Sequence, residues 1–440
     1  MDSNRVTLQT HLDGRWQDAM VIRFDQPEQG LASVCSTEYF SHYLVEHLHA
    51  LDSVLQPSVS AGYPLSWDIH RGIAPAFLHD IIPAGAARRH ILACMSVPLG
   101  AGEDFFLLQQ CTTAPIGHLR ILEGVERLSS SPLTGFSRAE VIRRDTLFLD
   151  HAYDHGAAVG GASGAGGEAP KLLLAEDVSG ALYPDASLPD EQARHHWFVK
   201  FPRHPAAATD RNILFSEYCY YRALGALRFN TIASDGLAYE EANRPSLWMP
   251  RFDRQVEGET VKRLAVESIY SLCGVTRPGS RMDHVAVAER LVEVWVAAGQ
   301  QQGIPGMLRE YLRRDLINQV LGNTDNHGRN LAVQREADSI SLAPMYDIAP
   351  MVMDPAGVVR TTRWPDGIEQ LNQVDWRRAC QQLGRWVDGD ELFEGLREDA
   401  AALLALPDLL SSLHLPEETW NAPLIPLRRL PATLQKWGLI

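Results

Sequence analysis

The chain is organised around the polar stretch 323–330, which reads Asn323-Thr324-Asp325-Asn326-His327-Gly328-Arg329-Asn330. Before it, apolar residues recur at every fourth position, at Leu308, Leu312, Leu316 and Val320. This spacing predicts a helix with one apolar face, and Gly322 stands where a C-terminal cap is expected. The polar stretch is therefore predicted to be a loop carried by a rigid helix.

Two short strands are predicted after this loop, at residues 331–333 and 340–342, and the second leads to Asp347. Asp325, Asn330 and Asp347 are therefore expected to converge at one end of a small hairpin. Phosphoryl transfer needs a carboxylate that orients the attacking hydroxyl and oxygen ligands for Mg²⁺, and these three side chains would supply both. The alternative is a plain polar turn, because Asn, Asp and Gly are ordinary turn residues.

Residues 196–202 form an aromatic and β-branched segment with a single cation, Lys200, and are predicted to be a strand. In one interpretation this is an edge-strand lysine that points to solvent. In the other, Lys200 binds ATP phosphates and pairs with a carboxylate on the next helix. That helix begins near Asn212 and carries Glu217, which is the predicted partner.

A glycine-rich segment precedes the predicted strand 172–175 and contains Ser163, Gly164, Ala165, Gly166 and Gly167. Glycines let backbone N–H groups approach phosphate oxygens closely. The segment matches neither the P-loop pattern nor a clean G-x-G-x-x-G, so a flexible linker is the alternative. Its position ahead of the lysine strand favours a nucleotide-binding loop.

Residues 247–249 are predicted to be a strand that ends at Pro250. In a two-lobed kinase, a strand at this point runs into a hinge whose backbone binds adenine. Asp253 or Arg254 would then reach the ribose, or the two would form an ion pair on the surface.

The composition limits the classes of function. A formal net charge of −15 argues against a bulk nucleic-acid-binding surface. The six cysteines are scattered and form no C-x-x-C pair, which favours reduced thiols in a cytoplasmic protein over a zinc site or a disulfide framework. The N-terminus lacks an apolar signal core, and no apolar run is long enough to span a membrane.

Residues 1–130 are predicted to be a separate α+β unit with a strand at 20–24 and a helix at 39–55. His79-Asp80 suggests a catalytic pair, but a surface or capping role is favoured because nothing nearby in the sequence completes a site. Beyond residue 256 the pattern becomes helical, and the predicted helices are 261–272, 285–298, 376–383, 391–404 and 430–437.

The order of these motifs resembles the HipA-type serine/threonine kinases of bacterial toxin–antitoxin systems. The resemblance extends along most of the chain, through segments 77–85, 115–117, 163–171, 197–202, 251–254, 323–330 and 345–350. It implies a two-lobed, protein-kinase-like α+β fold with an added N-terminal α+β subdomain and a helical C-terminal lobe. The implied domains are an N-terminal subdomain at 1–130, a β-rich nucleotide-binding lobe at 131–255 and a helical lobe at 256–440.

The resemblance also implies roles for residues. Lys200 would contact the ATP phosphates, and Asp325 would be the catalytic base. The backbone from Met249 to Phe252 would hold adenine, with Asp253 near the ribose. Asn330 and Asp347 would bind Mg²⁺. His327 would position the loop or serve only as a hydrogen-bonded structural histidine, and in neither role would it transfer the proton.

In this family a serine of the glycine-rich loop is autophosphorylated, which ejects the loop and silences the kinase. Ser163 is the matching residue, and the added charge of about −2 would repel ATP phosphates. Arg329 replaces the usual Lys and Ala84 replaces the usual Glu of the N-terminal motif. The resemblance further implies a protein substrate of the translation machinery, such as an aminoacyl-tRNA synthetase, and a separate HipB-type antitoxin that makes the contact with DNA.

Two other functions fit the same sequence. The D-x-H-x-x-N pattern also resembles the catalytic loop of phosphoinositide kinases, so the phosphate acceptor would be a lipid or a small molecule. A protein without catalysis, acting as an antitoxin-bound co-repressor, is the third interpretation. Labelling of the protein by Mg-ATP and its loss in Asp325→Asn distinguish these cases.

Overall fold

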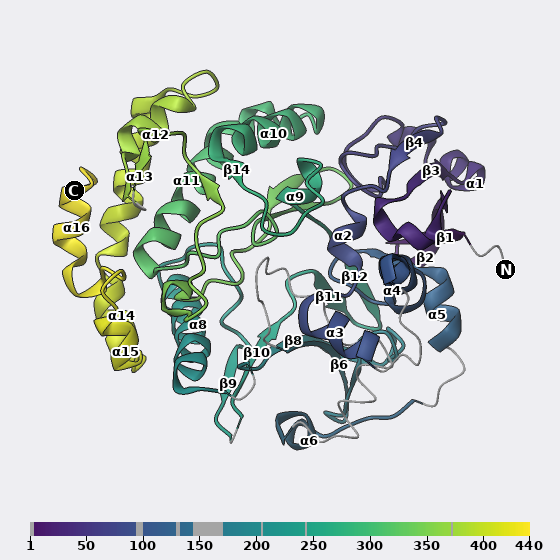
Figure 1. The fold of residues 1–440 in the computed structure, drawn as a ribbon, viewed down its shortest axis with the longest axis horizontal. Coiled ribbons are helices and arrows are strands. Elements are labelled where there is room, and N and C mark those ends of the chain that lie inside the picture. The colour runs from purple at the N-terminus through teal and green to yellow at the C-terminus, as the bar shows by residue number, and fades with distance from the viewer. Residues whose placement is uncertain are drawn as a thin grey trace.

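The computed structural model describes residues 4–93, 100–128, 133–143, 170–203, 206–242, 244–370 and 373–440. Figure 1 shows the N-terminal sheet on one side, a second sheet at the centre and a layer of helices on the other side. Among the helices of the described ranges, none combines the length and apolar character needed to cross a bilayer.

The N-terminal subdomain is built on a five-stranded antiparallel sheet in the order β4-β3-β2-β1-β5. Its strands are β1 (Arg5–Leu12), β2 (Arg15–Phe24), β3 (Val34–Tyr39), β4 (His70–Ile73) and β5 (Leu119–Ile121). Its helices are α1 (Ser41–Glu46), α2 (Leu78–Ile81), α3 (Gly85–Ala93), α4 (Glu103–Cys111) and α5 (Leu122–Leu128). The sheet has its own apolar core, so this part of the chain buries a hydrophobic face independently of the lobes.

The helix predicted at 39–55 is wrong in extent. Tyr39 ends β3, helix α1 covers only Ser41–Glu46, and a short 3₁₀ turn follows at Leu48–Ala50. Tyr43 and Leu44 of this helix are buried as the pattern predicted. The helix stops early because the chain then turns to bring residues 53–61 against the rest of the molecule, a contact that local periodicity does not encode.

The second sheet carries the lysine strand. Its order is β7-β6-β8-β10-β9, and all of its neighbours are antiparallel. The strands are β6 (Lys171–Asp177), β7 (Leu182–Pro184), β8 (Ala193–Lys200), β9 (Ala238–Glu240) and β10 (Ser246–Pro250). Helix α8 (Ala208–Ala226) follows β8, and α6 (Arg138–Arg143) precedes the sheet. Because β8 lies between β6 and β10, the edge-strand interpretation of Lys200 is wrong.

The strands that follow form separate sheets of two or three strands. They are β11 (Arg254–Glu257), β12 (Thr260–Arg263), β13 (Ala265–Ser268), β14 (Met282–Asp283), β15 (Ala332–Arg335), β16 (Ile340–Leu342), β17 (Thr362–Arg363), β18 (Glu369–Gln370) and β19 (Gln373–Val374). The predicted hairpin is present as the antiparallel pair β15-β16, and β13 adds to its free side.

The helix predicted at 261–272 is therefore wrong. Residues 260–263 and 265–268 are strands, and only α9 (Ile269–Leu272) is helical. Thr260–Arg263 alternates exposed and buried side chains, which is the period of a strand. The longer helical pattern was produced by apolar residues that in fact belong to two different strands and a single turn of helix.

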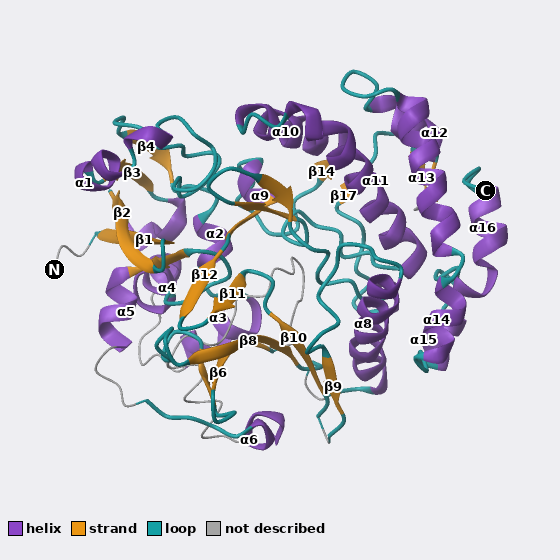
Figure 2. Ribbon diagram, turned by 180° about the vertical axis from the view of Figure 1, so that it is seen from behind, coloured by secondary structure: helices purple, strands orange, loops and turns teal. Residues whose placement is uncertain are grey.

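The C-terminal lobe is helical, as predicted. It contains α10 (His284–Ala297), α11 (Ile304–Leu321), α12 (Trp376–Gln382), α13 (Gly389–Leu403), α14 (Leu406–Ser412), α15 (Glu417–Asn421) and α16 (Leu430–Lys436). Short 3₁₀ helices lie at Pro27–Ala32, Gly100–Gly102, Gln301–Gly303, Met351–Met353 and Leu427–Arg429. Figure 2 shows α12 to α16 gathered on the side of α8 and α11 that faces away from the N-terminal sheet.

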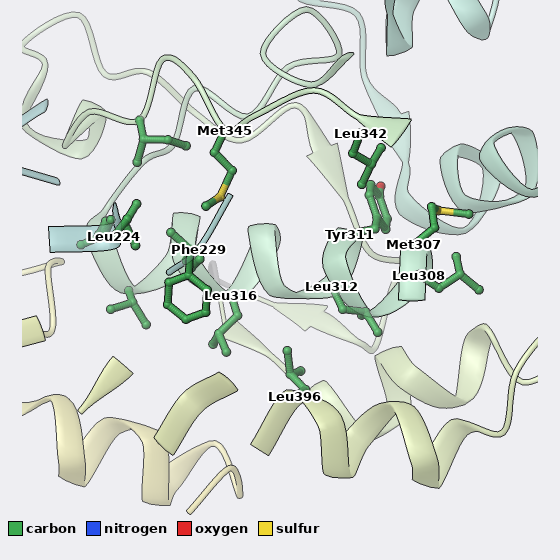
Figure 3. Close-up of a cluster of buried hydrophobic side chains, with 14 of the residues drawn as sticks. Leu224, Phe229, Met307, Leu308, Tyr311, Leu312, Leu316, Leu342, Met345 and Leu396 are labelled. Carbon is green, nitrogen blue, oxygen red and sulfur yellow. The ribbon is translucent and has the colours of Figure 1, made fainter. Parts of the chain in front are cut away.

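Helix α11 is at the centre of this lobe. Its residues Leu308, Leu312 and Leu316 are buried completely, and the close-up shows them in one row with Leu396 of α13 beneath (Figure 3). Full burial of such a side chain stabilises the fold by about 1.5–3 kcal/mol. Gly322 ends the helix with a φ of 68°, the left-handed conformation expected of a glycine cap. The loop at 323–330 therefore begins from a rigid support.

Candidate active site

The loop at 323–330, called the catalytic loop below, is held by backbone hydrogen bonds from α9. The N–H of Tyr270 donates to the carbonyl of Gly328 at 3.2 Å, and the N–H of Ile269 donates to the carbonyl of Leu331 at 2.9 Å. The Asn323 side chain donates to the backbone carbonyl of Asp347 at 3.2 Å. The catalytic loop and the segment after β16 are therefore fixed to one another, as the predicted hairpin requires.

Asp325 is buried, with 8% of its surface exposed. Its backbone N–H donates to Oδ1 of Asn323 at 3.2 Å, and its carbonyl accepts from the Asn330 side chain at 2.8 Å. Burial, and then the negative charge of Asp347, raise the pKa of Asp325 to about 7. The carboxyl group therefore changes its charge near neutral pH, which suits a group that accepts a proton.

Asp347 lies between two lysines. Its carboxylate pairs with Lys200 and, at 3.3 Å, with Nζ of Lys171. Lys171 and Lys200 are opposite each other in the β6-β8 register, so both side chains leave the sheet at one place. Burial alone would raise the pKa of Asp347, but Lys171 and Lys200 lower it well below its ordinary value. Asp347 is therefore ionised over the physiological range.

The predicted pairing of Lys200 with Glu217 is present. Nζ of Lys200 donates to Oε1 of Glu217 at 2.6 Å, and the same oxygen accepts from the Tyr221 hydroxyl at 2.7 Å. Burial alone would lower the pKa of Lys200, but Asp347 and Glu217 together raise it above its ordinary value. Lys200 is therefore a fixed cation between two carboxylates from α8 and from the end of the hairpin.

A cleft that is open to solvent begins at these charges. Lys171, Lys200 and Asp347 line one end, and Met249 and Phe252 line the hinge side. The N-terminal subdomain supplies a further wall through residues 79–84 and 111–116. Asp325 and Asn330 are not part of its lining. The cleft has the mixture of apolar walls and a few charged groups that is typical of a small-molecule site.

Asp253 and Arg254 do not form a surface ion pair, so that alternative is wrong. The Asp253 carboxylate is 1% exposed and accepts hydrogen bonds from Arg251, from Arg254 and from the N–H of Gly117 at 2.7 Å. Both arginines also pair with the buried Asp185. This network joins the hinge to the N-terminal subdomain, and the contact of Asp253 with ribose stays a prediction.

The predicted metal ligands can be tested by their hydrogen bonds. Oδ1 of Asn330 is buried and has no hydrogen-bond partner in the described ranges, although its Nδ2 donates to Asp325. An unpaired buried oxygen costs about 1–3 kcal/mol, so a cation there would stabilise the loop. Among the described residues, no cluster of three His, Cys, Asp or Glu side chains could hold a metal ion. The unpaired amide oxygen of Asn330 and the carboxylate of Asp347 are oxygen ligands of the kind that Mg²⁺ takes, with phosphate and water completing its shell.

The family described as the HipA-like C-terminal domain matches residues 163–404, more than half of the chain. The chain belongs to the HipA-like kinase family. The HipA of Shewanella oneidensis MR-1, solved with HipB and operator DNA, superposes with a TM-score of 0.63 at 17% identity, covering 98% of this chain and 97% of that one. The predicted kinase-like α+β fold is thereby confirmed.

A second solved structure is more distant. The Helicobacter pylori proinflammatory kinase CtkA has a TM-score of 0.33 and 13% identity, and the match covers 56% of this chain and 88% of that one. No curated protein matches the chain.

His327 of this HipA-like chain supports the catalytic loop. Its Nδ1 accepts from the N–H of Arg329 at 3.2 Å, and its ring stacks on Tyr270 with centroids 6.0 Å apart. Burial lowers the pKa of His327 to about 4, so the imidazole is neutral. Its Nε2 lies 3.5 Å from Oδ1 of Asp325. These contacts are those of a hydrogen-bonded structural histidine, one of the two roles predicted for it.

Sequence reasoning gave Lys171 no role and placed Asp80 on the surface or at a cap. Lys171 is buried beside Asp347, and the only local signal was its position at the start of the strand after the glycine-rich segment. Asp80 lines the cleft, and burial raises its pKa to about 6 even though Arg329 opposes this shift. The surface interpretation of Asp80 is wrong. Its partners are Ser268 and Arg329, which lie nearly 190 and 250 positions further along the chain.

The glycine-rich segment lies outside the described residues, and this applies to Ser163, Gly164, Ala165, Gly166 and Gly167. Their roles in phosphate binding and autophosphorylation stay predictions. The described residues resume at Pro170, directly before Lys171, which forms an ion pair with Asp347.

Proposed function

We propose that this HipA-like protein is an ATP-dependent serine/threonine protein kinase that transfers the γ-phosphate of ATP to a hydroxyl of another protein. The observation that carries the proposal is the convergence of three separate segments on one charged centre. Lys200 pairs with Glu217 and with Asp347, and Lys200 and Asp347 line one end of the cleft. The catalytic loop, which carries Asp325 and Asn330 outside the cleft lining, is tied to the backbone of Asp347 through the Asn323 side chain. These are the groups that phosphoryl transfer needs, since catalysis there rests on positioning and on neutralising charge.

The nucleotide would occupy the cleft with its phosphates at Lys171 and Lys200. Two buried cations there would bind phosphate oxygens with charge-assisted hydrogen bonds. Adenine would lie against Met249 and Phe252 and bind the hinge backbone, and Asp253 would lie near the ribose. Of these contacts, the phosphate end is the one best supported, because Lys171 and Lys200 share one carboxylate that phosphates could replace.

Asp325 would orient the acceptor hydroxyl and accept its proton. A carboxyl group with a pKa near 7 is suited to this, because it is substantially ionised at neutral pH and still basic. Asn330 and Asp347 would hold Mg²⁺, which neutralises the charge that develops on the phosphates when it is bound. Asn330 also fixes the backbone of Asp325, so one side chain would both hold the ion and orient the base.

We further propose that Ser163 is autophosphorylated, that the protein is cytoplasmic, and that a HipB-type antitoxin provides its contact with DNA. The resemblance of segment 163–171 to the family motif supports the first point. The similar Shewanella protein was solved with HipB and operator DNA, which supports the last. The family resemblance also supports a substrate in the translation machinery, such as an aminoacyl-tRNA synthetase.

The decisive experiment uses purified full-length protein, radiolabelled ATP and magnesium. Wild type is expected to label itself, and Asp325→Asn is expected to lose about 10²–10⁴-fold of the rate, the usual contribution of a positioned base. Asp338→Asn is the matched control, since Asp338 is exposed in the turn of the same hairpin. Label on a co-incubated lipid but on no protein would favour the lipid-kinase alternative, and equal rates in the two variants would contradict the role of Asp325.

A further inference from the structure

The N-terminal subdomain makes a side-chain contact with the support of the catalytic loop. Asp80, on the short helix α2, accepts a hydrogen bond from the N–H of Ser268 at 3.0 Å through one oxygen. Its other oxygen accepts from the Ser268 hydroxyl at 2.8 Å. In Figure 1, α2 lies between the N-terminal sheet and the strands of the two lobes. The carboxylate thus bridges two parts of the chain 188 residues apart.

Ser268 is the N-cap of α9, the helix that holds the catalytic loop. Its Oγ accepts from the N–H of Ser271 at 3.1 Å, so the hydroxyl both donates to Asp80 and caps the helix. The next residues, Ile269 and Tyr270, donate their backbone N–H groups to Leu331 and Gly328. A displacement of Ser268 would therefore move the donors that position both ends of the segment 328–331.

A second connection runs directly to the catalytic loop. Nε of Arg329 lies 3.8 Å from Oδ1 of Asp80, and Arg329 is 8% exposed. Within the described ranges, this Nε has no hydrogen-bond partner. His79 is the other titratable group of α2 near this arginine, and burial, with the charge of Arg329, lowers its pKa to about 4, so it is neutral. Asp80 is thus the anion that faces Arg329 from α2.

We propose that Asp80 is a positioning residue, which holds the catalytic loop in its active geometry through Ser268 and Arg329. The inference rests on the proposed kinase function, and it makes residues 1–128 part of the catalytic apparatus rather than a separate docking unit. Asp80 would act without touching the reacting atoms, since its contacts are to the cap of α9 and to a side chain next to Asn330. A misplacement of about 1 Å in such a loop lowers the rate about 10²-fold.

The test compares Asp80→Asn with Asp68→Asn in the full-length protein. Asparagine keeps the size of Asp80 and one acceptor oxygen but removes the charge that faces Arg329. Asp68 is an exposed aspartate of the same subdomain that also accepts from a serine hydroxyl, Ser66 at 2.9 Å, so it is a matched control. In Asp80→Asn, kcat is expected to fall about 10- to 100-fold with a much smaller change in the KM for ATP.

Two further measurements separate positioning from a loss of stability. In a double-mutant cycle, Asp80→Asn is expected to lower kcat less in an Arg329→Met background than in wild type, because the contact with Arg329 is already lost while the contact with Ser268 remains. Hydrogen exchange of the backbone amides in 325–331 is expected to become at least about tenfold faster in Asp80→Asn, with an unchanged thermal midpoint. Asp68→Asn should change neither quantity.

The outcomes distinguish this inference from the proposed function. If the wild type has no kinase activity but the amides of 325–331 still exchange faster in Asp80→Asn, the proposed function is wrong and the structural coupling holds. An active Asp80→Asn with wild-type kcat, or additive effects of Asp80→Asn and Arg329→Met, would overturn the positioning role. A fall in the thermal midpoint that matches the loss of kcat would also overturn it, because Asp80 would then be a stabilising residue only.

Discussion

Replacement of Lys200 by methionine should destabilise the fold in a way that depends on pH. Nζ of Lys200 lies 2.6 Å from Glu217 and also pairs with Asp347. Coulomb's law at an effective dielectric constant of about 20 gives an attraction of about 6 kcal/mol at this distance, which desolvation partly offsets. Removing one partner of a buried ion pair costs about 3–5 kcal/mol. Lys200→Met should therefore lower the free energy of unfolding by about this amount at pH 8.

The pH dependence follows from the carboxylates left behind. In folded wild type the pKa of Asp347 is depressed. Its contribution to stability is therefore complete above the pKa of the unfolded chain, about 4, and is lost only as pH falls through the depressed pKa of the folded chain. Wild type should thus change little between pH 5 and pH 8 through this group. Without Lys200, only Lys171 of the two lysines still opposes the effect of burial, and because burial is the larger influence the pKa of Asp347 rises. A raised carboxyl pKa gives stability that is present below the unfolded value and lost as pH rises.

The loss of unfolding free energy in Lys200→Met, relative to wild type, should therefore be smaller at pH 5 than at pH 8. The difference is up to about 1.4 kcal/mol for each pH unit in which the folded variant binds the proton and the unfolded chain does not. Urea unfolding at the two pH values measures it. Lys262→Met is the matched control, because Lys262 pairs with Glu336 on the surface and should contribute less than about 1 kcal/mol. Two results would refute this reasoning about Lys200, Glu217 and Asp347. One is a loss of unfolding free energy in Lys200→Met equal to that in Lys262→Met, and the other is a loss that is the same at both pH values.

Three further predictions concern activity and the catalytic loop. Because burial and Asp347 raise the pKa of Asp325 to about 7, kcat/KM should rise about tenfold per unit below pH 7 and level off above it, as a pH–rate profile would show. Asn330→Ala should raise the magnesium concentration needed for half-maximal rate, measured by magnesium titration. A half-maximal concentration equal to that of wild type would contradict a metal role of Asn330. In Gly328→Ala the new methyl group would overlap the Tyr270 ring, so the unfolding free energy should fall by about 1–3 kcal/mol.

Local sequence patterns predicted the elements that carry the site. The four-residue spacing of Leu308, Leu312 and Leu316 identified α11, and the glycine after it identified its cap. The aromatic and β-branched segment around Lys200 identified β8, and the position of Glu217 on the next helix identified its partner. These succeeded because each depends on residues that are close in sequence or on a pairing that the order of elements imposes.

The failures share a different physical cause. Asp80 and Lys171 take their character from partners more than 170 residues away, so no local pattern could show that they line the cleft. Asp253 pairs with its close neighbours Arg251 and Arg254, but its contact with Gly117 spans 136 residues, which no local pattern encodes. The predicted helix at 261–272 failed because β13 is stabilised by pairing with β15, which lies almost 70 residues further along. Tertiary pairing there overrides the local helical pattern.

Glu267 and Arg335 bind the N-terminal subdomain to the rest of the chain, which limits the fragments that can fold. The Glu267 carboxylate accepts from the Ser60 hydroxyl at 2.6 Å and from the N–H of Ala61 at 2.9 Å, and Arg335, fully buried, donates to the carbonyls of Val54, Ser58 and Val59. A fragment that starts at residue 133 would lose all of these partners and expose two charges next to the hairpin that bears the catalytic loop. Recombinant work on the two lobes therefore has to keep the first subdomain, or supply it as a second polypeptide, for the kinase portion to remain folded.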